Sequence, residues 1–175
     1  AFAAKSPRLP RPGGVGEASR LSHPPADIPI FLATLAPRSL AFTGAGEDGW
    51  LGTSFSPDHA DAHLAYIRDG AAKAGRSMAN VELHAGCQVS VGENVEEIID
   101  ARRPGVAFQM GAMGSAQTNF YNDAFKRAGF TDDALAIQKL WIEGKRDEAA
   151  ARVPDEMVTQ FGAFGTPEMV KERFK

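Results

Sequence analysis

The spacing of hydrophobic and polar positions changes several times along the chain, and each change marks an expected element. Residues 28–33 are largely apolar, as buried parallel strands are, and a helix is predicted over residues 37–45. A short strand is predicted over residues 49–53. Residues 81–91 alternate between apolar and polar, which predicts a single strand with one buried face. Strands separated by helices favour an α/β fold with a parallel sheet.

Capping residues locate further helices. We expect a helix over residues 57–75, because Ser56 is a good N-cap, and another from 95 to about 103, because Asn94 and Glu97 resemble a capping box. A Gly-rich loop is expected over residues 111–115. The remaining expected elements are helices over residues 122–128, 132–143 and 146–151, a last helix capped by Thr166, and a possible short strand near residues 161–164.

Three or four parallel strands leave a sheet with open edges. A complete (β/α)8 barrel ordinarily needs about 250 residues, whereas the chain has 175. We therefore predict that residues 28–175 are the C-terminal half of such a TIM barrel, roughly strands 5 to 7 with their helices, and that the N-terminal half is missing. Residues 1–27, rich in Pro and Gly, are expected to be a loop or linker.

Composition narrows the possible partners. The net charge is −3 with the basic residues scattered, which argues against nucleic-acid binding. No apolar run approaches the length of a membrane span, and no signal peptide is visible, so no membrane contact is expected. Cys87 is the only cysteine, which fits a reducing compartment and makes the cytoplasm the expected location.

The turn between the first strand and the first helix is a candidate anion site. Ala36 would occupy the N-cap position and has no side-chain oxygen to bond the free N–H groups of the first turn. Pro37 suits the first helical position, and Arg38 adds a positive charge. These features suit a phosphate, although water or a neighbouring loop is the alternative partner for the N–H groups.

Two further groups of residues are candidates for substrate binding. Thr53 and Ser54 follow the second strand, and ligands of barrel enzymes bind at the carboxyl ends of strands. The loop over residues 111–121 either borders a substrate pocket or only connects two helices. Its candidate contact residues are Met113, Ser115, Asn119 and Tyr121.

The histidines and the cysteine favour structural roles. His59 and His63 are four residues apart, a spacing that suits a metal but is common on solvated helices, and no third ligand is evident. No metal is therefore expected. His84 falls on the face opposite the alternating apolar set and is interpreted as a sheet-surface residue, and Cys87 on the apolar face is interpreted as a buried, inert thiol.

Several motifs, in order and spacing, resemble the bacterial luciferase-like flavin and deazaflavin oxidoreductases. The motifs lie at residues 28–38, 44, 47–53 and 164–170. Residues 105–115 and 119–122 resemble the branch of that family that uses coenzyme F420, an 8-hydroxy-5-deazaflavin. The resemblance covers nearly everything after about Leu21.

The resemblance implies a TIM barrel with the cofactor across the carboxyl ends of its strands. In the family, the loop after the fifth strand holds the cofactor phosphate, and here that loop corresponds to Ala33, Thr34, Leu35, Ala36, Pro37 and Arg38. Thr53 matches a position that in some members meets a substrate phosphate. The implied chemistry is hydride transfer with F420, or a flavin monooxygenase reaction if the cofactor is FMN. The family's proton donors lie mostly in the missing half, so no catalytic acid or base is assigned.

Two functional classes remain open. The first is an oxidoreductase chain that acts on a small molecule, either as a homodimer or in association with the missing half of the barrel. The second is a non-catalytic remnant that binds a cofactor or a partner without turnover.

Overall fold

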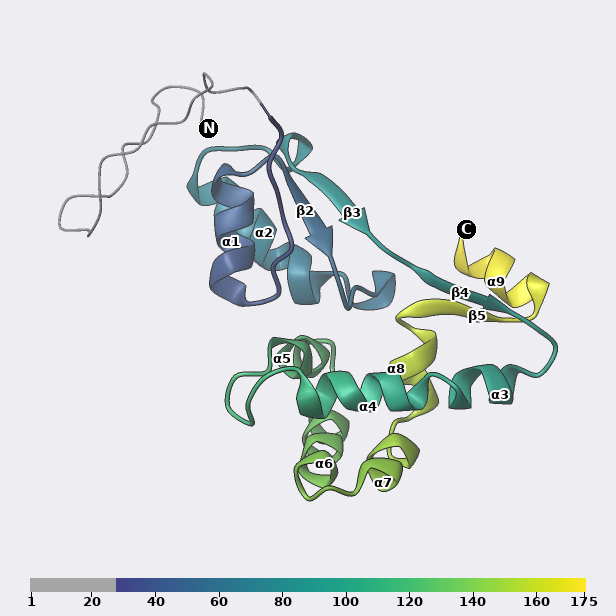
Figure 1. The fold of residues 1–175 in the computed structure, drawn as a ribbon. Coiled ribbons are helices and arrows are strands. Elements are labelled where there is room, and N and C mark those ends of the chain that lie inside the picture. Colours follow the sequence, from purple (N-terminus) through teal and green to yellow (C-terminus); the bar gives the residue numbers. More distant parts are fainter. Residues whose placement is uncertain (1–27) are drawn as a thin grey trace, which may run out of the picture.

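A computed structural model describes residues 28–175, and the expected linker over residues 1–27 lies outside the described residues. Strands β1 (Phe31–Leu32), β2 (Gly49–Gly52) and β3 (Glu82–Ala85) form a three-stranded sheet in that order (Figure 1). Strands β4 (Gln88–Val91) and β5 (Gly162–Gly165) form a separate pair. Every pairing is parallel, which confirms an α/β fold with parallel strands.

Helices surround these strands on several sides. Figure 1 shows α1 and α2 beside the three-stranded sheet and a layer of helices, α4 to α8, toward which β2 points. The helices are α1 (Pro37–Gly46), α2 (Asp61–Lys73), α3 (Val95–Asp100), α4 (Arg103–Ala112), α5 (Phe120–Arg127), α6 (Thr131–Ile142), α7 (Arg146–Ala151), α8 (Asp155–Thr159) and α9 (Pro167–Arg173), with 3-10 turns at Pro57–His59 and Met78–Asn80.

The prediction of a single strand over residues 81–91 is wrong. The structure divides it at Gly86 and Cys87, so that β3 pairs with β2 while β4 pairs with β5. Its alternating side chains are also not buried as a set, since Leu83 is 43% and Val91 57% exposed, and Cys87 is exposed rather than buried. Helix α1 contacts β2, and Ile67 of α2 shares a buried cluster with Trp50 of β2, whereas within residues 28–175 no helix packs closely on β3.

Two helix expectations also need correction. The helix expected from Val95 to about Arg103 ends at Asp100, and Pro104 lies in the first turn of a further helix, α4, which was not predicted. Proline suits a first turn because that turn has no intrahelical partner for an N–H group. The helix expected from Pro57 is a 3-10 turn followed by α2, and the Ser56 hydroxyl bonds the Asp58 carboxylate instead of capping the helix.

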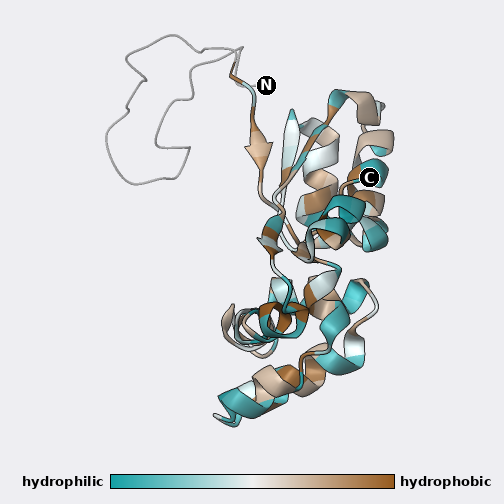
Figure 2. Cartoon of the chain, turned by 90° about the vertical axis from the view of Figure 1, so that its right-hand side faces the viewer, coloured by the Kyte–Doolittle hydropathy of each residue, from teal (hydrophilic) through white to brown (hydrophobic). Residues whose placement is uncertain are grey.

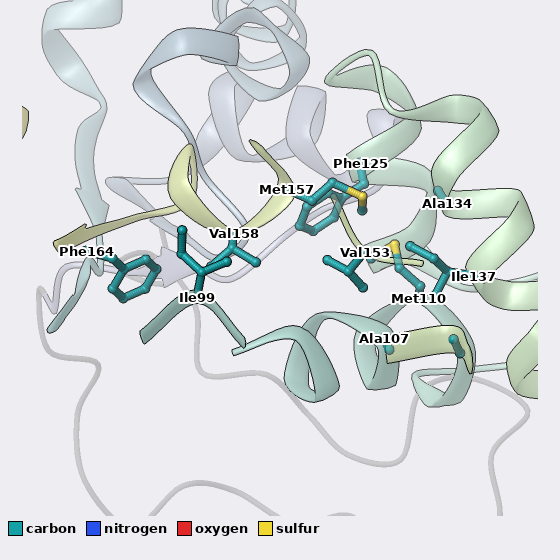
Figure 3. Packing of buried hydrophobic residues seen from close by; sticks show 11 residues of the cluster. Ile99, Ala107, Met110, Phe125, Ala134, Ile137, Val153, Met157, Val158 and Phe164 are labelled. Atoms are coloured by element: carbon teal, nitrogen blue, oxygen red, sulfur yellow. The ribbon is translucent and has the colours of Figure 1, made fainter. Parts of the chain in front are cut away.

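The buried hydrophobic residues form two clusters. The larger one joins helices α3 to α8 and strand β5 (Figure 3), and its central side chains include Met110, Phe125, Ile137 and Met157. The smaller cluster lies between α1, α2 and the sheet and consists of Leu40, Trp50, Ile67 and Val81. Figure 2 shows hydrophilic and hydrophobic segments side by side along the helices. No helix among residues 28–175 is long and apolar enough to cross a membrane.

Helices α1 and α2 are in backbone contact at two glycines. A Cβ atom on Gly44 would lie 1.9 Å from the carbonyl oxygen of Ile67, and one on Gly70 would lie 1.9 Å from the carbonyl oxygen of Ala41. Backbone atoms cannot rotate away as a side chain can, so these positions admit no side chain without separating the helices. The contact fixes α1, and with it the turn that precedes α1.

Replacing Gly44 therefore tests this contact. We expect Gly44→Ala to lower the free energy of unfolding by roughly 3 kcal/mol, the upper end of the usual cost of overpacking. Gly46 is the matched control in the same helix, because a Cβ there meets nothing within 4 Å. Gly46→Ala is expected to raise stability by about 0.5 kcal/mol. Urea denaturation measures both, and equal effects of the two substitutions would contradict the close contact.

Candidate functional site

The carboxyl ends of three parallel strands meet at one edge of the sheet. The turn after β1, Thr53 and Ser54 after β2, and Gly86 after β3 all lie there, because parallel strands end in the same direction. A cavity of about 440 Å³ opens between this edge and the helices α4, α5 and α8. It is lined by Thr53, Ser54, Phe55, Gly86, Gln88, Arg102, Gly105, Val106, Gln109, Tyr121, Phe125, Met157, Val158, Phe161 and Phe164.

The start of α1 has free backbone donors. Ala36 is the N-cap residue and makes no side-chain capping bond, as the sequence predicts. Pro37 has no N–H group, and within the described chain the N–H groups of Arg38 and Ser39 have no hydrogen-bond acceptor. The Arg38 side chain is exposed beside them. This end of the helix therefore presents two N–H groups and a guanidinium to solvent.

Hydrogen bonds from two side chains, Trp50 and Arg127, hold this turn in place. The buried Trp50 indole donates from Nε1 to the Thr34 carbonyl oxygen over 2.9 Å, and Arg127 Nη2 donates to the Leu35 carbonyl oxygen over 2.7 Å. Burial lowers the pKa of Arg127, opposed by the Tyr66 and Asp123 side chains. The carbonyl oxygens of Thr34 and Leu35 thus accept hydrogen bonds from the protein, while the N–H groups of Arg38 and Ser39 are free within the described chain.

Ser54 has an unusual backbone conformation at the end of β2. Its φ is +50°, in the left-handed region that residues other than glycine seldom adopt. Among residues 28–175 it is the only such case outside glycine. Local strain of this kind is concentrated at ligand sites, and Ser54 lines the cavity together with Thr53 and Phe55.

The residues expected in the loop at 111–121 separate into two groups. Tyr121 lines the cavity, whereas Met113 and Ser115 are exposed elsewhere. Asn119 is buried: its Oδ1 accepts from the N–H groups of Tyr121 and Asn122, and its Nδ2 donates to the carbonyl oxygens of Gln109 and Met110. Thr53, Ser54 and Tyr121 are thus brought together, and Asn119 fixes the start of α5 against α4.

The cavity is also lined by polar residues that no local sequence pattern singles out. Arg102, Gln88 and Gln109 line it, from the start of α4, from β4 and from α4 respectively. No helix was predicted over residues 104–110, and no local pattern indicates that the start of β4 lies beside the residues that follow β2.

The histidines have separate environments. His59 Nε2 lies 2.6 Å from Gln160 Oε1, and the exposed His84 bonds Glu82 over 2.6 Å, which confirms its surface role. The prediction that His63 lies on a solvated helix face is wrong, because the residue is only 2% exposed. Its ring lies 5.4 Å from the Trp50 ring, and neither ring nitrogen has a partner within the described chain. Burial, and secondly the charge of Arg127, lower its pKa to about 4.

Comparison with known proteins identifies the chain. The family model described as luciferase-like monooxygenase matches residues 4–175. The chain belongs to the luciferase-like monooxygenase family. A protein of Mycobacterium tuberculosis named as a coenzyme F420-dependent oxidoreductase is 34% identical over 95% of this chain and 50% of its own length. A 5,10-methylenetetrahydromethanopterin reductase of Archaeoglobus fulgidus is 29% identical over 89% of the chain and 46% of its own length.

Solved structures agree with this membership of the luciferase-like family. The coenzyme F420-dependent tetrahydromethanopterin reductase of Methanopyrus kandleri matches with a TM-score of 0.61 and 25% identity, over 85% of this chain and 41% of that one. An F420-dependent secondary alcohol dehydrogenase shares the fold, with a TM-score of 0.58 at 15% identity over 98% of this chain and 47% of that one. The chain spans about half the length of the curated relatives it matches.

The buried His63 makes stability depend on pH. Its pKa is about 4 in the folded state and about 6.5 when unfolded, so the unfolded chain binds more protons between these values and stability falls as pH falls. We expect the free energy of unfolding to drop by about 2 kcal/mol between pH 7 and pH 5 from this group alone. Urea denaturation at both values, with His63→Phe as the comparison, measures it. A drop of the same size in His63→Phe would contradict this assignment.

Proposed function

We propose that the chain is part of a coenzyme F420-dependent oxidoreductase that transfers hydride between the deazaflavin and a small-molecule substrate. The names of its relatives in the luciferase-like family support this proposal. The observation that carries it is local: a helix start with free N–H groups lies at the same sheet edge as a cavity of about 440 Å³. Cofactor and substrate sites of α/β proteins are commonly of that size and in that position.

The phosphate of the cofactor is proposed to bind at the turn formed by Ala33, Thr34, Leu35, Ala36, Pro37 and Arg38. The N–H groups of Arg38 and Ser39, the α1 dipole and the Arg38 guanidinium all favour an anion there. The turn contains no carboxylate that would repel it. The Trp50 and Arg127 bonds orient the turn before a ligand arrives, which lowers the cost of binding.

The substrate is proposed to occupy the cavity. Thr53, Ser54 and Tyr121 are lining residues that carry hydroxyl groups, and aromatic and aliphatic side chains line the cavity beside them, as in other small-molecule sites. When bound, F420 supplies the hydride chemistry, and the chain's own residues bind and orient the reactants. Met113, Ser115 and Asn119 lie outside the cavity lining, so any role of theirs in substrate binding would require the loop between α4 and α5 to move.

The open sheet edges suggest that another polypeptide segment completes the site. Within residues 28–175, β1 and β5 each pair on one side only. Leu51 on β2 and Val89 on β4 are exposed, and such apolar strand surface ordinarily has a cover. We propose that the N-terminal half of a TIM barrel, or a second copy of this chain, covers it.

Titration with F420 tests the proposed phosphate site. We expect Arg38→Ala to weaken F420 binding on the order of tenfold to a hundredfold, because a charge-assisted hydrogen bond is lost. Ala36→Asp is expected to weaken it more, since a carboxylate would cap the helix and repel the phosphate. Fluorescence of F420 measures both affinities, and a parallel titration with FMN compares the two cofactors.

Arg68→Ala is the matched control for this titration. Arg68 is an exposed arginine on α2 that bonds Asp61, so its loss removes the same charge from outside the turn. Its F420 affinity should equal that of the parent protein. Parent-like binding by both Arg38→Ala and Ala36→Asp would refute the phosphate site. F420 binding without turnover of any substrate would instead favour the non-catalytic alternative.

A further inference from the structure

Among residues 28–175, the cavity has one charged side chain, and no carboxylate of these residues pairs with it. Arg102 is the only ionised group among the residues of the described chain that line the cavity. No carboxylate within residues 28–175 forms a salt bridge with it. The next residue differs sharply, because Arg103 pairs with both Asp100 and Asp155. The lack of a partner is therefore a property of Arg102 and not of this region of α4.

Neutral groups orient the Arg102 guanidinium without neutralising it. Its Nη2 donates to Ser90 Oγ over 2.5 Å, its Nη1 lies 3.5 Å from Gln88 Oε1, and its central carbon lies 5.2 Å from the centre of the Phe164 ring. A guanidinium has five N–H donors, and these contacts use two. Three donors are left without an acceptor among the described residues.

A half-buried cation of this kind favours an anionic ligand. Removing a charge from water is costly unless an opposite charge compensates it, and the planar guanidinium matches carboxylate and phosphate groups through paired hydrogen bonds. The stacked Phe164 ring and the Ser90 and Gln88 contacts restrict the side chain before binding. Less conformational freedom is therefore lost when the ligand arrives.

We propose that Arg102 binds a carboxylate or phosphate group of the ligand in this cavity, with the apolar body of that ligand against Phe55, Val106 and Phe161. The inference deepens the proposed function by naming the chemical class of its substrate. An anionic group could come from the substrate or from the acidic groups of the cofactor. The experiment below distinguishes these two sources.

Benzoate and benzamide are suitable probes, because they share a ring and a planar head group but differ in charge. In calorimetric or NMR titrations of the parent protein, benzoate is expected to bind on the order of tenfold more tightly than benzamide, as charge-assisted hydrogen bonds predict. Arg102→Gln should abolish this preference, and Arg102→Lys should retain part of it. Arg152→Gln is the control, since Arg152 is a surface residue paired with Asp133, and it should keep the full preference.

Two outcomes would overturn the proposal: equal binding of benzoate and benzamide by the parent protein, or an undiminished preference in Arg102→Gln. A merely structural role of Arg102 would weaken both probes equally and would also refute it. Repeating the titration with F420 present identifies the source of the anion. Competition between F420 and benzoate, with weaker F420 binding by Arg102→Gln, assigns the anion to the cofactor, whereas independent binding assigns it to the substrate. The benzoate and benzamide titrations can be interpreted even if F420 does not bind. The proposal for Arg102 and the proposal of F420 binding can therefore fail independently.

Discussion

Parallel pairing of β1, β2 and β3 is the constraint on which the candidate site depends. It brings three strand ends to one edge, so that a helix start, a strained serine and the mouth of a cavity become neighbours although they are distant in sequence. The two glycines between α1 and α2 then fix the position of α1 against α2. Trp50 links both features, because it is buried under these helices and bonds the turn before α1.

Electrostatics at this edge favours anions at some cost in stability. Free N–H groups at the start of α1, the exposed Arg38 and the unpaired Arg102 all present positive charge or donors toward solvent or the cavity. A fold selected for stability alone would pair or cap such groups. The buried His63 lies beside Trp50 with neither ring nitrogen hydrogen-bonded within residues 28–175, which adds a further cost. Costs of this kind are expected where binding, and not folding, has determined the residues.

Local signals in the sequence were sufficient for much of this architecture. Asn94 and Thr166 cap helices as predicted, because a capping bond involves residues three positions apart. The interruption of the strand at Gly86 could not be predicted, because it depends on which strands pair with β3 and β4. The place of Arg102 in the cavity depends in turn on that pairing, and the first of two consecutive arginines carries no local sign of a binding role. The exposure of Cys87 has the same non-local origin.

Backbone hydrogen exchange with and without F420 tests the central claim, that this sheet edge is the ligand site, most directly. The account predicts slower exchange at residues 33–39 and around the cavity residues at 53–55 when F420 is present, because the free N–H groups there gain an acceptor and lose contact with water. Helices α6 and α7, which do not line the cavity, should exchange at unchanged rates. Unchanged exchange at residues 33–39 at every F420 concentration, or protection confined to other segments, would contradict the account.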